Sequence, residues 1–231
     1  MISVASPMIA IPISVSLCQE LKQLNQRLQA GEREPLANEA GRLISDVACA
    51  TIDTIFGDML KRMADASGKS SYQDAQGTVE EVKAVLRKYL PWATGFFGNE
   101  RLMPVAQHYD QLLVVSPQDD APASAYLTFA ISAKLAEQSL HSLEQLRTGQ
   151  ATTARAAIDV LILVIEESLV PLLYTPKKLL KFNFVADKTL NGVISMTNSL
   201  AFRQLRKLGD QLEPTLFVPV ADHLQQFLRL P

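Results

Sequence analysis

"PVAQHYDQLL" (residues 104–113) and "PVADHLQQFL" (residues 219–228) are identical at six of ten positions. Each stretch begins with proline, which is favoured in the first turn of a helix, and carries a histidine at its fifth position, His108 or His223. The sequence therefore predicts two similar helices, one near the middle of the chain and one at its end. A segment that occurs twice indicates an internal repeat.

Other similarities recur at a separation of about 115–118 positions, as expected if the repeat extends beyond these ten residues. They are Leu43, Ile44 and Val47 against Leu161, Ile162 and Ile165, "RLQAGE" (27–32) against "QLRTGQ" (145–150), and "LRK" at 86–88 against 205–207. The polar segment "SPQDDAP" (116–122) lies between the copies. We interpret residues 1–116 as a first helical repeat with an extended N-terminal arm, 117–122 as a linker and 123–231 as a second helical repeat. The alternative is that two amphipathic helices that both start at proline resemble each other by chance.

Helical periodicity dominates the chain, and Ser16 with Gln19 fits a capping box at the start of the first helix. The predicted helices cover about 16–30, 35–65, 72–90, a short stretch from 104, 123–147, 153–174, 185–212 and the residues after 219. We expect an all-α fold, a helical bundle of about eight helices, in which two pseudo-twofold-related four-helix repeats pack into one domain. Apolar residues alternate with small ones from 9 to 17, which predicts an extended arm, and we expect no other strand.

Composition excludes several classes of protein. The formal net charge of −2 over 231 residues provides no basic face for nucleic acid. The two cysteines, Cys18 and Cys49, are too few for a disulfide framework, which favours a cytoplasmic location with reduced thiols. The uncharged N-terminus lacks the basic residues of a secretory signal. The most apolar stretch, 157–174, contains three carboxylates, so it predicts a core helix and no membrane span.

Six residues are candidates for a ligand site. Twofold-related copies could bring His108 and His223 together, as a metal site requires. Two histidines are too few ligands for most metal sites, so a structural hydrogen bond from each histidine to a neighbouring helix or loop is the preferred interpretation. Aromatic residues with glycine in "PWATGFFG" line either a pocket or a hinge. Glu166 interrupts the most apolar helix, and a buried carboxylate there would mark a site. The aromatic candidates are Trp92, Phe96 and Phe97.

Three functions fit these features. The first is a non-enzymatic, all-helical interaction or scaffold protein, a homodimer or the partner of another protein, since no catalytic motif is present and the apolar arm invites burial by a second subunit. The second is a helical module that binds an apolar small molecule or lipid. The third is a metal-dependent enzyme that uses the paired histidines. No cofactor and no metal is predicted from any motif in the sequence.

Overall fold

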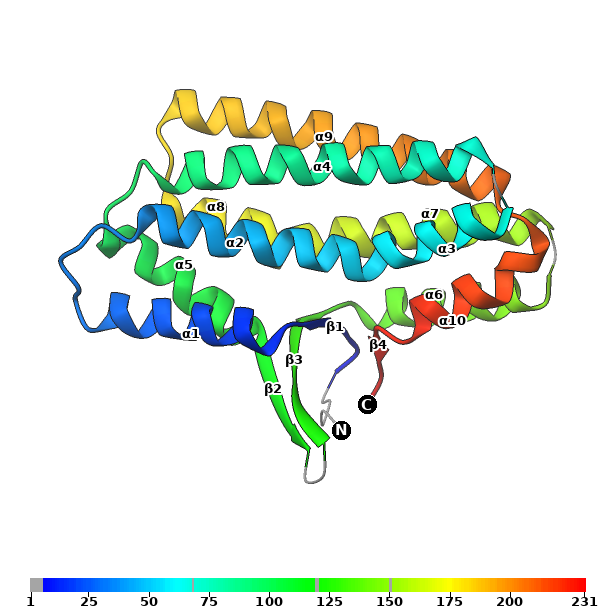
Figure 1. The fold of residues 1–231 in the computed structure, drawn as a ribbon, viewed down its shortest axis with the longest axis horizontal. Coiled ribbons are helices and arrows are strands. Elements are labelled where there is room, and N and C mark those ends of the chain that lie inside the picture. Colours follow the sequence, from blue (N-terminus) through cyan, green and yellow to red (C-terminus); the bar gives the residue numbers. More distant parts are fainter. Residues whose placement is uncertain (1–5, 68, 119–120, 150) are drawn as a thin grey trace.

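The computed structural model describes residues 6–67, 69–118, 121–149 and 151–231. Helices form most of it, and a small antiparallel sheet closes one side (Figure 1). The expectation of a mainly helical bundle is thus confirmed. Ten α-helical segments are present in the described chain, and two pairs of them run on through a turn of π-helix, so that eight continuous helical rods result.

Strands, helices and a π-helical turn follow one another in a similar order in the two halves of the chain. In the first half they are β1 (Met8–Ile13), α1 (Val15–Gln29), α2 (Ala37–Ile52), a first π-helical turn (Asp53–Gly57), α3 (Asp58–Ser67), α4 (Ser70–Thr94), α5 (Asn99–Leu112) and β2 (Leu113–Gln118). In the second half they are β3 (Ala121–Ala130), α6 (Ala133–Arg147), α7 (Ala151–Leu169), a second π-helical turn (Val170–Tyr174), α8 (Thr175–Leu180), α9 (Phe184–Gln211), a 3-10 turn (Pro214–Leu216), α10 (Phe217–Gln225) and β4 (Leu228–Arg229).

The helix boundaries have local causes. α1 and α6 each follow a serine whose side chain accepts a hydrogen bond from the third residue on, Ser14 from Leu17 N and Ser132 from Leu135 N. The cap of α1 is therefore Ser14, two residues before the predicted one. Each helix is followed, two residues after its end, by a glycine with positive φ, Gly31 at 72° and Gly149 at 81°, a conformation that glycine adopts without strain.

Two prolines lie inside helices that they were expected to bound. α4 continues past Pro91 to Thr94, whose hydroxyl donates to the carbonyl oxygens of Leu90 and Pro91. Pro91 O also accepts the backbone N–H of Gly95, so the hydroxyl adds a second hydrogen bond at the end of the helix. Pro104 stands five residues into α5, which begins at Asn99. The expected helix start at Pro104 is wrong, because the five residues before this proline are helical as well.

The expectation of no strand beyond the arm is wrong. The sheet has the order β2-β3-β1-β4 with antiparallel neighbours, and it includes most of the residues expected at the start of a helix at 123. Ala125, Leu127 and Phe129 are buried along β3 at the two-residue period of a strand, and Thr128 between them is buried as well. Pairing with β1, more than 110 residues away in sequence, decides the conformation.

The N-terminal arm is extended as predicted, but it lies inside the sheet. β1 pairs with β3 on one side and with β4 on the other, and Ile9, Ala10, Ile11 and Ile13 are buried. The segment expected as a linker falls in the hairpin of β2 and β3, and its residues 119 and 120 lie outside the described residues. Because β1 is covered by its own chain, it has no free apolar face for a partner subunit.

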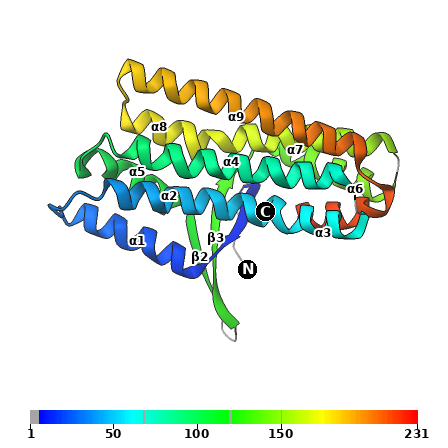
Figure 2. The same ribbon diagram turned by 45° about the horizontal axis from the view of Figure 1, so that its top comes forward.

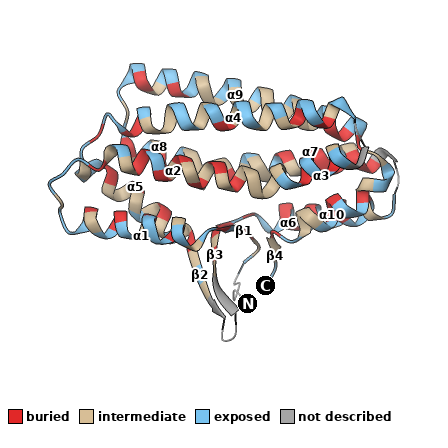
Figure 3. Ribbon diagram, in the orientation of Figure 1, coloured by how far each residue is buried: buried red, intermediate tan, exposed pale blue. Residues whose placement is uncertain are grey.

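The helices form layers (Figures 1 and 2). α4 and α9 lie side by side as an outer layer, α2–α3 and α7–α8 form the layer beneath it, and the remaining helices with the sheet form the third. Figure 3 shows buried residues throughout the inner layers, whereas α4 and α9 are mainly half-buried or exposed. In the part of the chain that is described, no helix is both long enough and apolar enough to cross a bilayer.

Candidate functional site

A large apolar cavity separates the outer layer from the layer beneath it. Its volume is about 340 Å³, within the usual range of small-molecule sites. α4 and α9 form its roof, and α2, α7 and the two π-helical turns form its sides and floor. About three quarters of the lining side chains are apolar. Those at the floor include Val105, Tyr109 and Leu127.

The cavity is elongated. Its lining extends from Ala75 to Thr94 on α4, about 28 Å along the helix axis, and from Leu190 to Leu208 on α9, about 27 Å. A single acyl chain spans about 15 Å, half the hydrocarbon thickness of a bilayer. The cavity therefore has the length and the apolar character to hold one extended hydrocarbon chain.

The inner face of α9 is incompletely covered. No residue between Asn191 and Lys207 is buried, although Val193, Ile194 and Phe202 point into the cavity. Such a face arises when an amphipathic helix packs over empty space instead of over side chains. A bound apolar molecule would cover this face and would therefore stabilise the folded protein.

The polar groups of the large cavity are few. Tyr109 is buried and donates its hydroxyl proton to Leu172 O at 2.7 Å, and burial raises the pKa of its phenol, so it stays neutral. At the end formed by α8, Lys177 pairs with Asp187 at 2.6 Å and bonds Asn191. The one lysine in the lining is thus neutralised by its partner, and nothing in the described lining favours a free anion.

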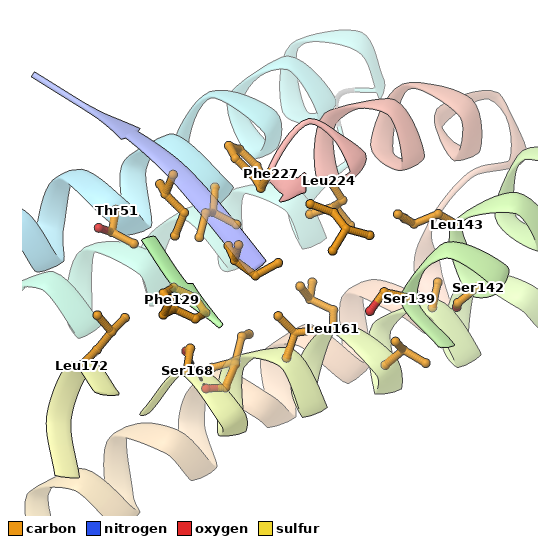
Figure 4. Close-up of a pocket in the computed structure, with 18 residues that line it drawn as sticks. Thr51, Phe129, Ser139, Ser142, Leu143, Leu161, Ser168, Leu172, Leu224 and Phe227 are labelled. Atoms are coloured by element: carbon orange, nitrogen blue, oxygen red, sulfur yellow. Dashed lines mark hydrogen bonds between the residues drawn. The ribbon is translucent and has the colours of Figure 1, made fainter. Parts of the chain in front are cut away.

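A second, smaller cavity of about 110 Å³ adjoins the first (Figure 4). It lies between α6, α7, α10 and the sheet. Five residues line both cavities: Thr51, Ile55, Ile165, Ser168 and Leu172. In Figure 4, Thr51, Phe129 and Ser168 lie on one side of this space, and Ser139 and Ser142 of α6 lie on the other.

Unpaired polar atoms gather at the two cavities. In the described residues, five buried side-chain atoms have no hydrogen-bond partner, and four of them belong to lining residues. Native proteins pair nearly all such atoms, so a concentration of exceptions points to a missing partner. The four are Thr51 Oγ1 at both cavities, Ser142 Oγ at the smaller one, and Thr197 Oγ1 and Gln204 Nε2 at the larger one.

Both predicted histidines bond backbone carbonyls of π-helical turns. His108 Nε2 lies 2.6 Å from Pro171 O, and His223 Nε2 lies 2.9 Å from Ile55 O. Because a carbonyl oxygen only accepts, each Nε2 carries the proton that it donates. His223 Nδ1 also accepts from Gln226. Neither histidine lines a cavity, and each one is held by a separate carbonyl.

The other predicted site residues are not brought together. Trp92 and Phe96 stack edge-on at 4.8 Å and are exposed at the end of α4, whereas Phe97 is buried against Phe182. Glu166 is exposed on α7. None of these residues lines either cavity, although Phe182, the partner of Phe97, lines the larger one. Over the described residues, no three histidine, cysteine, aspartate or glutamate side chains are close enough to hold a metal ion.

Sequence reasoning missed the residues that line the cavities. The signal in α9 was present: apolar residues recur every three or four positions from Val193 to Leu205, yet the helix is only half covered. An apolar stripe predicts which face turns inward, but it does not reveal whether side chains or a void meet that face. Comparisons of the chain with protein-family models, with curated proteins and with solved structures find no match.

Proposed function

We propose that this protein binds an elongated apolar molecule, such as one with a single hydrocarbon chain, between the α4–α9 layer and the α2–α7 layer. The cavity of about 340 Å³ carries this proposal, because it is lined by apolar residues and roofed by a helix whose inner face is only half-covered. Each methylene moved from water into such a site contributes about 0.8 kcal/mol, so a chain of ordinary length supplies enough free energy for binding.

Binding of N-phenyl-1-naphthylamine, an uncharged fluorophore that brightens in apolar surroundings, tests the proposal. After extraction of any co-purified lipid, the protein should bind the probe saturably with one site per chain. Ala201→Phe places a ring in the lining and should weaken binding at least tenfold. Ser199→Phe adds a ring of similar size on the exposed face of the same helix, outside the cavity lining, and is the matched control.

Thermal unfolding separates loss of the site from loss of the fold. Ala201→Phe should melt no lower than the wild type, because the added ring fills a void rather than a packed core. Equal probe binding by both variants and the wild type, or no saturable binding by the wild type, would contradict the proposal.

We propose further that the two halves of the chain are copies of one unit related by an approximate twofold axis. The sheet supports this: Ala10 faces Thr128, its own counterpart 118 positions on, at the centre of the β1–β3 pairing. The outer pairings also correspond, with Leu113 opposite Leu127 and Leu228 opposite Ile9. A duplicated unit whose halves associate around a dyad produces this reciprocal pattern.

The histidine bonds support the same proposal. His108 of the first half bonds the π-helical turn of the second half, and His223 of the second half bonds that of the first. Replacement of either histidine by alanine should lower the free energy of unfolding by about 1 kcal/mol, the net value of one hydrogen bond. Urea denaturation of the two variants should give losses that agree with each other. A large loss for one histidine and none for the other would show that the bonds are not equivalent.

The predicted self-association, metal chemistry and cytoplasmic location stay predictions. The observation that favoured a homodimer was the apolar arm, and β1 is covered by its own sheet. An apolar ligand is favoured because it needs only the cavity that is present in the single chain.

A further inference from the structure

Two serines line the smaller cavity at positions that correspond to leucines in the proposed repeat of the first half. α1 and α6 have equal length and equivalent serine caps 118 positions apart, so Ser139 and Ser142 of α6 correspond in position to Leu21 and Leu24 of α1. Both leucines are buried in the packed core of the first half. The serines are buried too, but they border a space of about 110 Å³.

Burial of these hydroxyls requires a partner. Ser139 Oγ donates to Leu135 O of its own helix at 2.8 Å, but Ser142 Oγ, in a residue only 6% exposed, has no partner among the described residues. An unpaired buried hydroxyl is costly, and the packed leucines show that this fold accommodates an apolar alternative at the equivalent site. The cavity is roomy enough to supply the partner from a bound molecule.

The lining also restricts the chemistry of that partner. The described lining of the smaller cavity contains no charged residue, and its polar groups are the hydroxyls of Thr51, Ser139, Ser142 and Ser168. A carboxylate or phosphate would be desolvated there without a cation to pair with it. A hydroxyl or a carbonyl group needs only one or two hydrogen bonds, which serine supplies.

We infer that the smaller cavity binds the uncharged polar end of the ligand, an alcohol or a carbonyl group, at Ser142 and Ser139, while the hydrocarbon chain lies in the larger cavity. The two spaces adjoin at Thr51 and Ser168, which line both of them. This inference rests on the proposed function, since it assigns the two ends of one ligand to the two cavities. The ligand class is therefore a long-chain neutral amphiphile.

Displacement of N-phenyl-1-naphthylamine by decan-1-ol, decane and decanoate tests this inference. Ser142→Ala should weaken decan-1-ol binding about three- to tenfold, the effect of one lost hydrogen bond, and should leave decane binding unchanged. Ser142→Leu, which restores the residue of the first half, should reduce decan-1-ol binding further by filling the cavity. Decanoate should bind the wild type more weakly than decan-1-ol.

Ser45→Ala is the matched control, because Ser45 is also a buried serine but lines neither cavity. It should leave decan-1-ol binding within about twofold of the wild type, well below the effect of one lost hydrogen bond. Decan-1-ol binding that is unchanged by Ser142→Ala, or that is lowered equally by Ser45→Ala, overturns the inference even if decane still binds. If neither decane nor the fluorophore binds the wild type, the proposed function fails as well.

Discussion

Replacement of Gly41 by alanine tests how α4 is held over the cavity. An ideal Cβ at Gly41 of α2 would lie 2.5 Å from the Cα of Pro91 and would also overlap Thr94 Oγ1, both on α4. Carbon atoms in ordinary contact are about 3.5–4.0 Å apart. α4 would therefore have to move outward by about 1 Å at this end of the cavity.

The expected loss follows from two opposing effects. Alanine is favoured over glycine in a helix interior by about 1 kcal/mol. Overpacking costs about 1–3 kcal/mol, and the upper end applies here because the overlap includes backbone, which cannot rotate away. The net loss in the free energy of unfolding should be about 1–2 kcal/mol. Gly77, within α4, has no atom near the position of an added Cβ, so Gly77→Ala should raise stability by about 0.4–1 kcal/mol.

Urea denaturation followed by circular dichroism measures both variants under the same conditions. The two free energies of unfolding should differ by about 1.5–3 kcal/mol, with Gly41→Ala the less stable. Equal stability of the two variants would refute the argument, because it would mean that α2 and α4 do not approach each other closely at Gly41.

Two other predictions concern buried ionisable groups. Burial lowers the pKa of Lys83, but its hydrogen bonds to Asp53 and Glu80 outweigh burial and raise that pKa above its ordinary value. The stability that Lys83 contributes is fully present below its unfolded-state pKa of about 10.4 and is lost as the pH rises through the folded-state pKa. The difference between the urea midpoints of the wild type and Lys83→Met should therefore shrink between about pH 9 and pH 12, and a constant difference would contradict this assignment. Burial raises the pKa of the Cys18 and Cys49 thiols, so a thiol reagent near neutral pH should label them only in urea; rapid labelling of the folded protein would show that they are accessible.

The predicted helices and the observed ones differ mainly where distant segments meet. The long helix expected from 35 to about 65 is present as α2 and α3, but the π-helical turn between them has no simple sequence signal. The strand β3 was interpreted as helix because "SAYLTFAIS" is short and apolar, and a short apolar run fits either structure. Among the candidate site residues, the histidines were found by their repetition, but their bonds to Pro171 and Ile55 depend on how the halves pack.

What the sequence alone determined is local: the helical periodicity and the glycines that follow α1 and α6. Each of these depends on residues within one or two turns of each other, so the chain reveals them without a fold. Only the tertiary structure decided how the strands pair, that His108 and His223 each bond the π-helical turn of the other half, and where the two cavities lie. A cavity is the difference between the space that the backbone encloses and the volume of the side chains that fill it. A serine in place of a leucine on α6 borders a void only because α7, α10 and the sheet surround it in the folded protein.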